Sequence, residues 1–479
     1  MKHLKRILAA LLVCAMVLPL VACGSSGKAY DPSEAFDENN IVLSFGMLSD
    51  THITETATSY TNVTLPKALQ LLTEVSGGLD AICVSGDLSE WGKSGQIEQF
   101  AKILKENLDM DSIPLISCSG NHDYFYQYYD KSKAADFGIR LADYIGEASF
   151  AYDVTDYTTA PRSCRHVVMN GIHFICLNVS NYVEPNDPYD EETVAWFETE
   201  MAAAAKESKN NPIIVLSHIS IPGTIAGSNY SSSYYPLITW HSDQMREILE
   251  QYPQTIYFSG HTHYSNVGDN GIMQTGFTAV DVMPLTYMIT DYGFYQNNEG
   301  LGCTPDDAYE YPGAMLVEID KNGNTRISRY NAATGEQVRD YWYVGNASCT
   351  TQLYGVERSY VDGPTWDSAE PLKMSVVANE DGTTSNVTIS GSAAQTDNDV
   401  YFYRVDIYKL AKDGVKTYID SRDYASDYYT KAQKEDLSKT IELELGSLPS
   451  ENSGFYIVVT PYDIWGNSGV PISLTYSVK

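Results

Sequence analysis

The sequence predicts a mixed α and β domain followed by a small all-β sandwich, and three observations lead to this fold class. First, a length of 479 residues exceeds one ordinary domain. Second, short apolar runs alternate with segments of helical periodicity between residue 41 and about residue 345. Third, the helical periodicity largely disappears beyond Val344, where Gly, Asn and Asp turns separate short alternating runs.

The first residues are typical of a targeting segment. Three basic side chains lie within residues 2–6, and residues 7–21 form an apolar run. The stretch LVACG at residues 20–24 resembles a bacterial lipobox. The resemblance implies a lipoprotein signal peptide over residues 1–22 and a lipidated Cys23, so that lipid alone anchors an extracytoplasmic protein to the bacterial cell membrane. The alternative is a plain signal peptide cleaved nearby, with Cys23 incidental.

The charge balance limits the partners of this chain. It has 31 Lys and Arg against 62 Asp and Glu, a formal net charge of -31. That excess disfavours binding to a nucleic acid polymer, because such binding needs a basic surface. Residues 23–40 are polar and carry Gly, Ser, Asp and Glu, which is typical of a flexible tether. No apolar run after the signal segment is long enough to span a bilayer.

The cysteines outside the signal segment divide by their surroundings. A thiol in an apolar strand acts as a small hydrophobe, and this interpretation applies to Cys83, Cys118 and Cys176. Polar neighbours surround Cys164, Cys303 and Cys349. An oxidising compartment permits a disulfide among these three, and the sequence selects no pair.

Helices and strands follow one another in the first domain. We expect helices over 66–76, 96–108, 191–207 and 242–251. The first of them has Pro66 at its start and Gly77-Gly78 at its end. We expect strands over 41–48, 81–84, 113–118, 173–177 and 212–216, and a hairpin that joins 314–320 to 324–330.

The last part of the chain is predicted to be a β-sandwich over residues 371–479, after a linker over 346–370. Examples of its expected strands are 372–377, 385–390, 401–410 and 440–445. The stretch 456–467 resembles the final strands of a fibronectin type III-like module. Such a module could contact the cell wall or serve as a spacer.

Metal-type ligands follow five of the apolar runs in the first domain. Ligands at the carboxyl ends of strands face the crevice where α/β folds bind their substrates. The five clusters are Asp50-Thr51-His52, Gly86-Asp87, Gly120-Asn121-His122-Asp123, Ser217-His218 and Gly260-His261-Thr262-His263. Because His261 and His263 alternate with Thr262, an extended segment would point both imidazoles the same way. Single histidines on apolar runs, His166 and His173, are interpreted as core residues.

These clusters resemble the motifs of the calcineurin-like metallophosphoesterase superfamily, D-x-H, G-D, G-N-H-D/E, H and G-H-x-H, in that order. The resemblance implies that residues 41–345 form a four-layer α/β/β/α sandwich with two divalent metal ions, Mn, Fe or Zn. It assigns Asp50, His52 and His263 to the first ion and Asn121, His218 and His261 to the second. It also implies that Asp87 bridges both ions.

The same resemblance implies a phosphoester hydrolase. A hydroxide between the metals would attack phosphorus, while His122 would assist the leaving group and Asp123 would orient His122. Both phosphodiesterase and phosphomonoesterase activity on a small substrate remain open. The aromatic stretch 124–129 could stack on a substrate ring or pack against its neighbours. The alternative function is a surface binding or scaffold protein with a glycan- or protein-binding β-sandwich and little catalysis.

Overall fold

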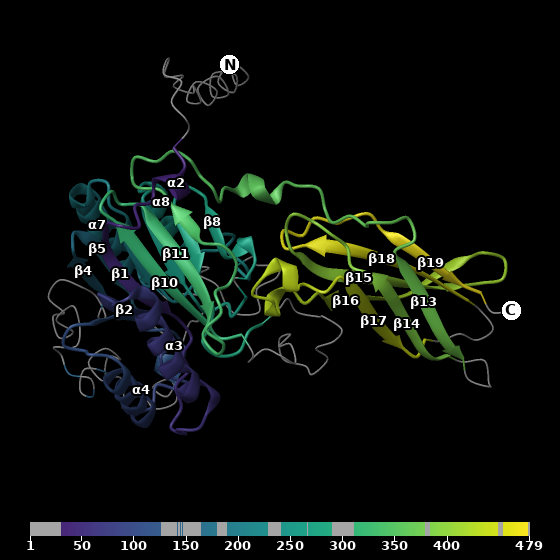
Figure 1. Cartoon of the computed structure of the whole chain (residues 1–479), viewed down its shortest axis with the longest axis horizontal. Coiled ribbons are helices and arrows are strands. Elements are labelled where there is room, and N and C mark those ends of the chain that lie inside the picture. The colour runs from purple at the N-terminus through teal and green to yellow at the C-terminus, as the bar shows by residue number, and fades with distance from the viewer. Residues whose placement is uncertain are drawn as a thin grey trace, which may run out of the picture.

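The computed structural model describes residues 30–125, 141, 144, 146, 164–179, 189–228, 241–265, 267–289, 311–378, 384–448 and 454–477. The expected signal peptide and the lipidated Cys23 lie outside these residues, as do Cys303 and residues 126–129 of the aromatic stretch. A mixed α and β part precedes an all-β part, and the two lie side by side in Figure 1.

The first sheet of the mixed part has the strand order β12-β11-β10-β1-β2-β3. Its strands are β1 (Ile41–Leu48), β2 (Ala81–Ser85), β3 (Leu115–Cys118), β10 (Gly313–Asp320), β11 (Thr325–Asn331) and β12 (Trp342–Val344). Strands β1, β2 and β3 run parallel, and β10 pairs antiparallel with β1. The carboxyl ends of β1, β2 and β3 therefore lie at one edge, where the first three motifs follow them.

The second sheet has the strand order β4-β5-β6-β7-β9-β8. Its strands are β4 (Arg165–Met169), β5 (Ile172–Leu177), β6 (Ile213–Ser217), β7 (Thr255–Ser259), β8 (Ile272–Gln274) and β9 (Thr278–Asp281). Strands β5, β6, β7 and β9 are parallel neighbours. Because β6 and β7 run the same way, His218 and the His261 motif leave this sheet at one edge.

The two sheets share an apolar core. The Phe45 ring on β1 lies 5.3 Å from that of Phe174 on β5 and 6.4 Å from that of Phe258 on β7. Helices α3 (Tyr60–Ser76) and α4 (Ser94–Asn107) pack in a cluster with residues of the first sheet. Helices α7 (Glu191–Ser208) and α8 (Ser242–Glu250) pack with residues of the second. This packing fits the predicted mixed α and β class.

Helix α3 begins earlier than predicted. It starts at Tyr60 and contains Pro66 in its interior, where the sequence pattern had placed a start. Tertiary contacts of the first turn explain the difference, since Thr61 Oγ1 donates to the His52 carbonyl at 3.1 Å. Asn62 Nδ2 donates to the Thr54 carbonyl at 2.9 Å. These bonds hold the first turn against the loop that carries His52, so Pro66 costs one hydrogen bond inside a helix already anchored.

The C-terminal part consists of a three-stranded sheet, β13-β14-β17, and a four-stranded sheet, β16-β15-β18-β19. The strands are β13 (Leu372–Ala378), β14 (Thr384–Ser392), β15 (Val400–Leu410), β16 (Lys416–Ala425), β17 (Thr440–Gly446), β18 (Gly454–Asp463) and β19 (Ile472–Tyr476). Val387 and Leu443 of one sheet pack with Val405 and Ile457 of the other in one buried cluster. The predicted all-β C-terminal part is therefore present.

Residues 30–40 are folded, although the sequence places them in a flexible tether. Helix α2 (Pro32–Ala35) lies in this segment. The backbone N–H of Asp37 donates to Asp320 at 2.9 Å, and the Asp37 carboxylate pairs with Lys321 at 2.9 Å. A flexible tether can therefore extend no further than residue 29, because the next residues are tied to the β10–β11 hairpin.

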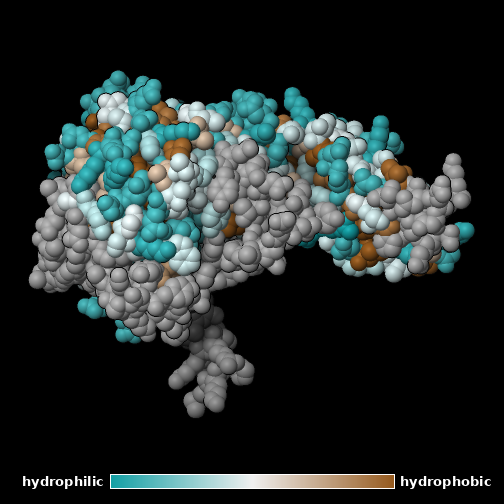
Figure 2. Space-filling model, turned by 90° about the horizontal axis from the view of Figure 1, so that it is seen from below, coloured by the Kyte–Doolittle hydropathy of each residue, from teal (hydrophilic) through white to brown (hydrophobic). Residues whose placement is uncertain are grey.

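On the face that Figure 2 shows, hydrophilic residues are spread over the described surface of both parts, with hydrophobic residues between them. Among the described residues, no helix is long and apolar enough to cross a membrane. Cys164 and Cys349 are free thiols, so they do not form a disulfide with each other. Cys164 is buried rather than polar in its surroundings, like Cys83, Cys118 and Cys176.

Candidate metal centre

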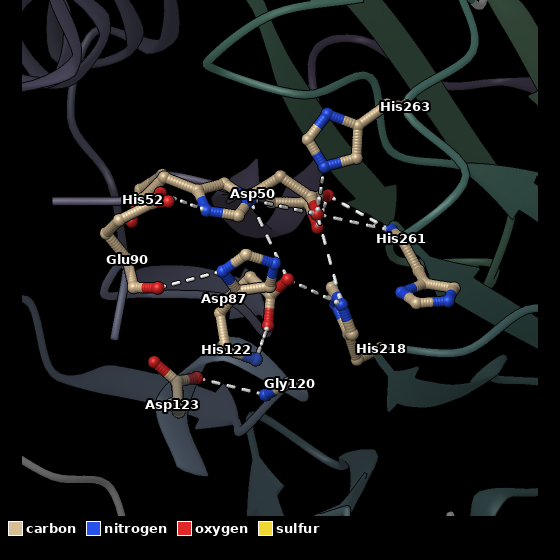
Figure 3. Close-up of polar contacts among 12 residues, drawn as sticks. Asp50, His52, Asp87, Glu90, Gly120, His122, Asp123, His218, His261 and His263 are labelled. Atoms are coloured by element: carbon tan, nitrogen blue, oxygen red, sulfur yellow. Dashed lines mark hydrogen bonds and ion pairs between the residues drawn. The ribbon is translucent and has the colours of Figure 1, made fainter. Parts of the chain in front are cut away.

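The strand-end motifs meet in one cluster (Figure 3). Asp50, His52 and His263 form one group whose ligand atoms all lie within 4.8 Å of one another. Asp87, His218 and His261 form a second such group, and His52, Asp87 and His122 form a third that overlaps both. Six of the seven metal ligands predicted from the motifs are thus brought together from both sheets.

The imidazole Nε2 atoms point at two carboxylates. His263 Nε2 lies 3.1 Å from Asp50 Oδ1, and His218 Nε2 lies 3.1 Å from Asp87 Oδ2. His52 Nε2 lies between the carboxylates, 3.8 Å from Asp50 Oδ1 and 3.7 Å from Asp87 Oδ2. Three imidazoles therefore surround the carboxylates of Asp50 and Asp87.

The Nδ1 atom of each of these rings contacts an oxygen atom outside the cluster. His218 Nδ1 donates to the carbonyl of Ser85 at 2.9 Å, and His263 Nδ1 donates to the carbonyl of Tyr287 at 2.8 Å. His52 Nδ1 lies 2.8 Å from Glu90 Oε2. A carbonyl oxygen only accepts, so these contacts place the proton on Nδ1 and leave Nε2 as the ligand atom. This is the usual arrangement around a metal-binding histidine.

Three buried atoms of the cluster lack hydrogen-bond partners among the described residues. They are Nε2 of His52, Nε2 of His218 and Oδ1 of Asn121. A buried polar atom without a partner costs about 1–3 kcal/mol, so such atoms call for an explanation. Nitrogen and oxygen ligands without thiolate suit Mn, Fe or Zn. The chemistry of the cluster therefore fits metal ions. Asn121 Oδ1 has no hydrogen-bond partner in the described part of the chain, so it is available as a ligand atom beside the other six predicted ligands.

The backbone of the cluster is unusual. Asp50, His52, Asp87, His261 and His263 all have positive φ, at 50°, 41°, 49°, 70° and 57°. Such conformations cost about 1–3 kcal/mol each and persist where the surrounding structure enforces them. The segment from His261 to His263 is consequently not extended, as the alternation with Thr262 had suggested. A left-handed bend, rather than a strand, turns both imidazoles inward.

Two motif glycines allow the close approach of the strands. A Cβ on Gly120 would lie 2.1 Å from Asp87 Oδ1 and 2.7 Å from His218 Cδ2. A Cβ on Gly260 would lie 2.3 Å from Asp50 Oδ2. Any side chain at either position would fill the space in which the ligand atoms meet, so the glycines are part of the centre.

Without metal, the cluster is a network of opposite charges. Burial lowers the pKa of His52, but the neighbouring carboxylates of Asp50, Glu90 and Asp87 outweigh it and raise that pKa to about 10. Burial likewise opposes the charged form of His218, and Asp87 and Asp50 raise its pKa to about 9. The pKa of Asp50 lies well below its usual value, because His263 and His218 outweigh the effect of burial. Metal ions would replace protons here.

His122 lies beside the cluster and differs from its neighbours. Its Nδ1 donates to the Glu90 carbonyl at 2.8 Å, and its backbone N–H donates to Asp87 Oδ1 at 2.8 Å. Burial lowers the pKa of His122 to about 4, although Asp87 opposes the shift. The ring therefore stays neutral at pH 7 in the metal-free protein, and Nε2 is the ring nitrogen that does not contact Glu90.

Asp123 does not orient His122, contrary to the sequence-based expectation. Its carboxylate accepts from the backbone N–H groups of Ser89 at 2.9 Å and Gly120 at 3.0 Å. The two residues lie in a 3₁₀ turn, η1 (His122–Tyr124), with about three residues per turn, so neighbouring side chains point about 120° apart. Asp123 thus holds the Asp87 loop and the Gly120 loop together, and the Glu90 carbonyl takes the predicted orienting role.

Sequence reasoning missed Glu90 and Tyr287. Glu90 contacts both His52 and His122, one through its carboxylate and the other through its carbonyl. Its position three residues after Asp87 in the same loop was the signal available. Tyr287 stacks on His263, with ring centroids 4.4 Å apart, and no spacing rule connects it to a motif.

Comparisons with known proteins agree with this geometry. Residues 43–265 match the family of calcineurin-like phosphoesterases. No curated protein matches the chain. Among solved structures, the chain is similar to a purple acid phosphatase from yellow lupin (Lupinus luteus) seeds, with 13% identity and a TM-score of 0.42 over 63% of this chain and 53% of that one. The chain thus spans about half the length of the lupin phosphatase.

A second similar structure is the spore cortex lytic enzyme SleM of Clostridium perfringens. It is 9% identical, with a TM-score of 0.20 over 92% of this chain and 100% of that one. TM-scores this low carry no argument about function, so the family match and the cluster decide the class.

Residues 43–265, which match the calcineurin-like phosphoesterase family, contain every residue of the Asp and His cluster. The family match and the cluster together support a metal-dependent phosphoester hydrolase, and the Asp and His cluster fits two divalent metal ions. Both statements confirm predictions made from the motifs.

Proposed function

We propose that the protein hydrolyses small phosphoesters with two divalent metal ions and acts outside the cytoplasm, anchored by lipid on Cys23. The observation that carries the hydrolytic part is the set of imidazoles whose Nδ1 atoms are held by outer acceptors while Nε2 faces Asp50 and Asp87. The lipobox resemblance at residues 20–24 supports the location.

The ligand assignment follows the two groups of the cluster. Asp50, His52 and His263 would hold one ion. Asp87 would be shared by both ions, since it belongs to the group with His218 and His261 and also to the group with His52. Asn121, which follows Gly120 at the same rim, would complete the second site with its amide oxygen.

When bound, the two ions supply an activated water and offset negative charge on the phosphoryl oxygens. The protein contributes orientation and a proton. His122 presents Nε2 toward the cluster, because Nδ1 is fixed on the Glu90 carbonyl. From this position His122 would act as a general acid and pass a proton from Nε2 to the leaving oxygen.

The described rim of the site is aromatic, which supports substrates that carry a planar ring. Phe125 packs on His122 with ring centroids 3.9 Å apart, and Trp91 lies 5.5 Å from Phe125. Trp91 is 39% exposed. Tyr287 adds a third ring beside His263 and His52. Aryl or nucleoside esters would stack on such surfaces.

The C-terminal part and the layering belong to the same proposal. Seven strands divided three and four between two sheets support a fibronectin type III-like module. Helices packed with each of two stacked sheets support the four-layer order of the first domain. Contact of the module with the cell wall stays a prediction. The complete ligand set argues against a scaffold without catalysis.

The test uses the soluble chain from Gly24 onward, loaded with Mn. Hydrolysis of p-nitrophenyl phosphate is compared with that of bis-p-nitrophenyl phosphate, with His122→Ala as the control. We expect turnover of at least one ester, and a preference for the diester would assign phosphodiesterase activity. No turnover of either ester by a protein with two bound ions would contradict the proposed function.

A further inference from the structure

The loop that carries His263 also contacts the C-terminal module. Ser265, two residues after His263, donates from Oγ to the carbonyl of Tyr429 at 3.3 Å. Val267 is fully buried in a cluster that contains Met283 and Met288 of the first domain and Ala432 of the module. Tyr429 and Ala432 belong to the connection between β16 and β17. One short loop thus joins a metal-type ligand to the second domain.

A second path runs through the segment that follows β9. The Tyr287 carbonyl accepts from His263 Nδ1 at 2.8 Å, and the Tyr287 ring stacks on that imidazole. Ile289 N–H donates to the His263 carbonyl at 2.7 Å. Between them, Met288 is fully buried in the cluster with Ala432. Consecutive residues of one segment therefore hold His263 on one side and meet the module on the other.

Buried polar contacts fix the module in this position. Arg339 Nη2 lies 3.0 Å from Asp399 Oδ1, and the two side chains are 7% and 3% exposed. The backbone N–H of Arg339 donates to the Ala432 carbonyl at 2.9 Å. Gln433 Nε2 donates to the Gln337 carbonyl at 2.7 Å. Arg339 also has a φ of 51°, a strained conformation that the contact maintains.

The same loop is held at its far end. Arg358 Nη2 donates to the carbonyls of Asp269 and Ile272 at 3.2 and 2.7 Å. The Arg358 guanidinium lies 5.2 Å from the ring centroid of Trp465 in the module. Asn270 Nδ2 donates to the Ile464 carbonyl at 3.4 Å. Ser265 and residues 267–272 are therefore enclosed between the catalytic domain, residues just before the module and the module itself.

We propose that the C-terminal module is a structural part of the metal centre. Its β16–β17 connection presses on Val267 and Met288 and so keeps His263 in the left-handed bend that turns Nε2 toward Asp50. Tyr287 and Met288 are positioning residues for that ligand. The inference rests on the proposed role of His263 as a metal ligand. It assigns the module a task that neither a spacer nor a cell-wall anchor would have.

The proposed effect of the module is specific to the site of the first ion. His263 belongs to the group of Asp50 and His52. In the other group, His218 is held by the Ser85 carbonyl, and the backbone N–H of His261 donates to Asp50 at 3.2 Å, so both are held within the catalytic domain. Disturbing the interface should therefore weaken binding of the first ion more than binding of the second. Groups that orient metal ligands typically change metal affinity by about 10–100-fold.

The test is Ala432→Glu in the full-length soluble chain, which places a charge at a site that is 4% exposed. The matched control is Val415→Glu, since Val415 is 56% exposed in the turn that follows β15. Strand β15 begins beside Asp399 and runs for 11 residues, so Val415 lies at the end away from the interface. Binding of Mn²⁺ is measured by calorimetry, and small-angle X-ray scattering reports whether the module has moved.

We expect Ala432→Glu to enlarge the molecule in scattering and to weaken one Mn²⁺ step by roughly 10–100-fold, with the other step unchanged. Val415→Glu should behave like the unmodified chain. A displaced module with both steps unchanged would overturn the inference. Equal weakening of both steps would also overturn it, because it would indicate general loss of structure. Unchanged scattering and binding would show that Ala432 is not packed at an interface, with the same consequence.

Failure of the proposed function is a separate result. If the unmodified chain binds fewer than two ions or hydrolyses neither ester, the proposed function itself is refuted, whatever the variants do. If the unmodified chain binds two ions and Ala432→Glu does too, only the role of the module fails.

Discussion

The first domain holds two sets of histidines that use their ring nitrogens in different ways. In the strand-end cluster, His52 and His218 fix Nδ1 on outer acceptors and leave Nε2 without a hydrogen bond. On β4 and β5, His166 Nε2 lies 2.8 Å from His173 Nδ1, and His166 Nδ1 contacts Glu200. The second set bonds within itself, and neither of its histidines belongs to a group of possible metal ligands among the described residues.

The difference shows what separates a metal site from a structural histidine pair. Both sets contain imidazoles and a carboxylate, and both follow from apolar runs in the sequence. Only the strand-end cluster combines buried carboxylates, outer acceptors on Nδ1 and glycines that leave room between the ligand atoms. The predictions below test each part of that combination.

The largest effect is expected for Asp87→Ala. This change removes the carboxylate shared by two groups of the cluster, so bound metal and activity should be lost together. Metal content by elemental analysis and hydrolysis of p-nitrophenyl esters measure both. Asp423→Ala, which removes a carboxylate paired with Arg404 in the module, serves as the control and should change neither. Normal turnover of Asp87→Ala with two ions bound would refute the assignment.

His122→Ala should separate binding from catalysis. The ring lies beside the cluster but is not an assigned ligand, so both ions should remain while the rate falls by roughly 10²–10⁴-fold. Single-turnover rates at saturating Mn²⁺, together with metal content, test this expectation. Loss of an ion in this variant would instead make His122 a ligand.

Glu90→Gln should weaken the first ion without removing it. The carboxylate that orients His52 becomes an amide, and a loss of about 10–100-fold in affinity is typical of such changes. The matched control is Glu200→Gln, which makes the same change beside His166. Equal affinities for Glu90→Gln and the unmodified chain in a Mn²⁺ titration would show that Glu90 does not support the ligand.

Metal binding should release protons and strengthen as pH rises. In the metal-free protein, the pKa values of His52 and His218 are raised to about 10 and about 9, so both rings are protonated at neutral pH. Each ring must lose its proton to bind metal, so the apparent affinity should rise by up to about tenfold per pH unit for each proton released. Calorimetry in buffers of different ionisation enthalpy counts those protons. An affinity that does not change between about pH 6 and pH 8 would contradict the raised pKa values.

The smallest effect is expected for His166→Gln. The pair with Glu200 is partly exposed, so its loss should cost less than about 1 kcal/mol of unfolding free energy. Metal content and turnover should equal those of the unmodified chain. A lost ion in this variant would show that the β4–β5 pair contributes to metal binding after all.

Sequence reasoning found six residues that the structure brings together, because their motifs follow apolar strands and resemble those of a known family. It could not supply the backbone of the centre, since residue type does not reveal that Asp50 and His263 have positive φ. It misassigned Asp123, because the direction of that side chain depends on a 3₁₀ turn of three residues. Tyr287 was invisible because it contacts His263 only through tertiary packing.

The fold was predicted best where strands are buried. Strand β1 was predicted with the bounds it has, and its residues from Leu43 onward are all buried. Strand β16 was not among the predicted examples, because Lys416–Ala425 is mostly polar and has one buried residue, so no apolar alternation marks it. The predicted start of helix α3 lies too late in the chain, because Pro66 is typical of a first helical residue. The contacts of Thr61 and Asn62, which the sequence does not reveal, hold the true first turn.

The left-handed residues of the centre bear on any attempt at protein engineering. Five ligands owe their direction to a backbone that ordinary strand ends do not adopt. A graft that copied the seven side chains onto another pair of sheets would therefore not copy the site. The transferable unit is the set of loops with their glycines and, if the module positions His263, a second domain as well.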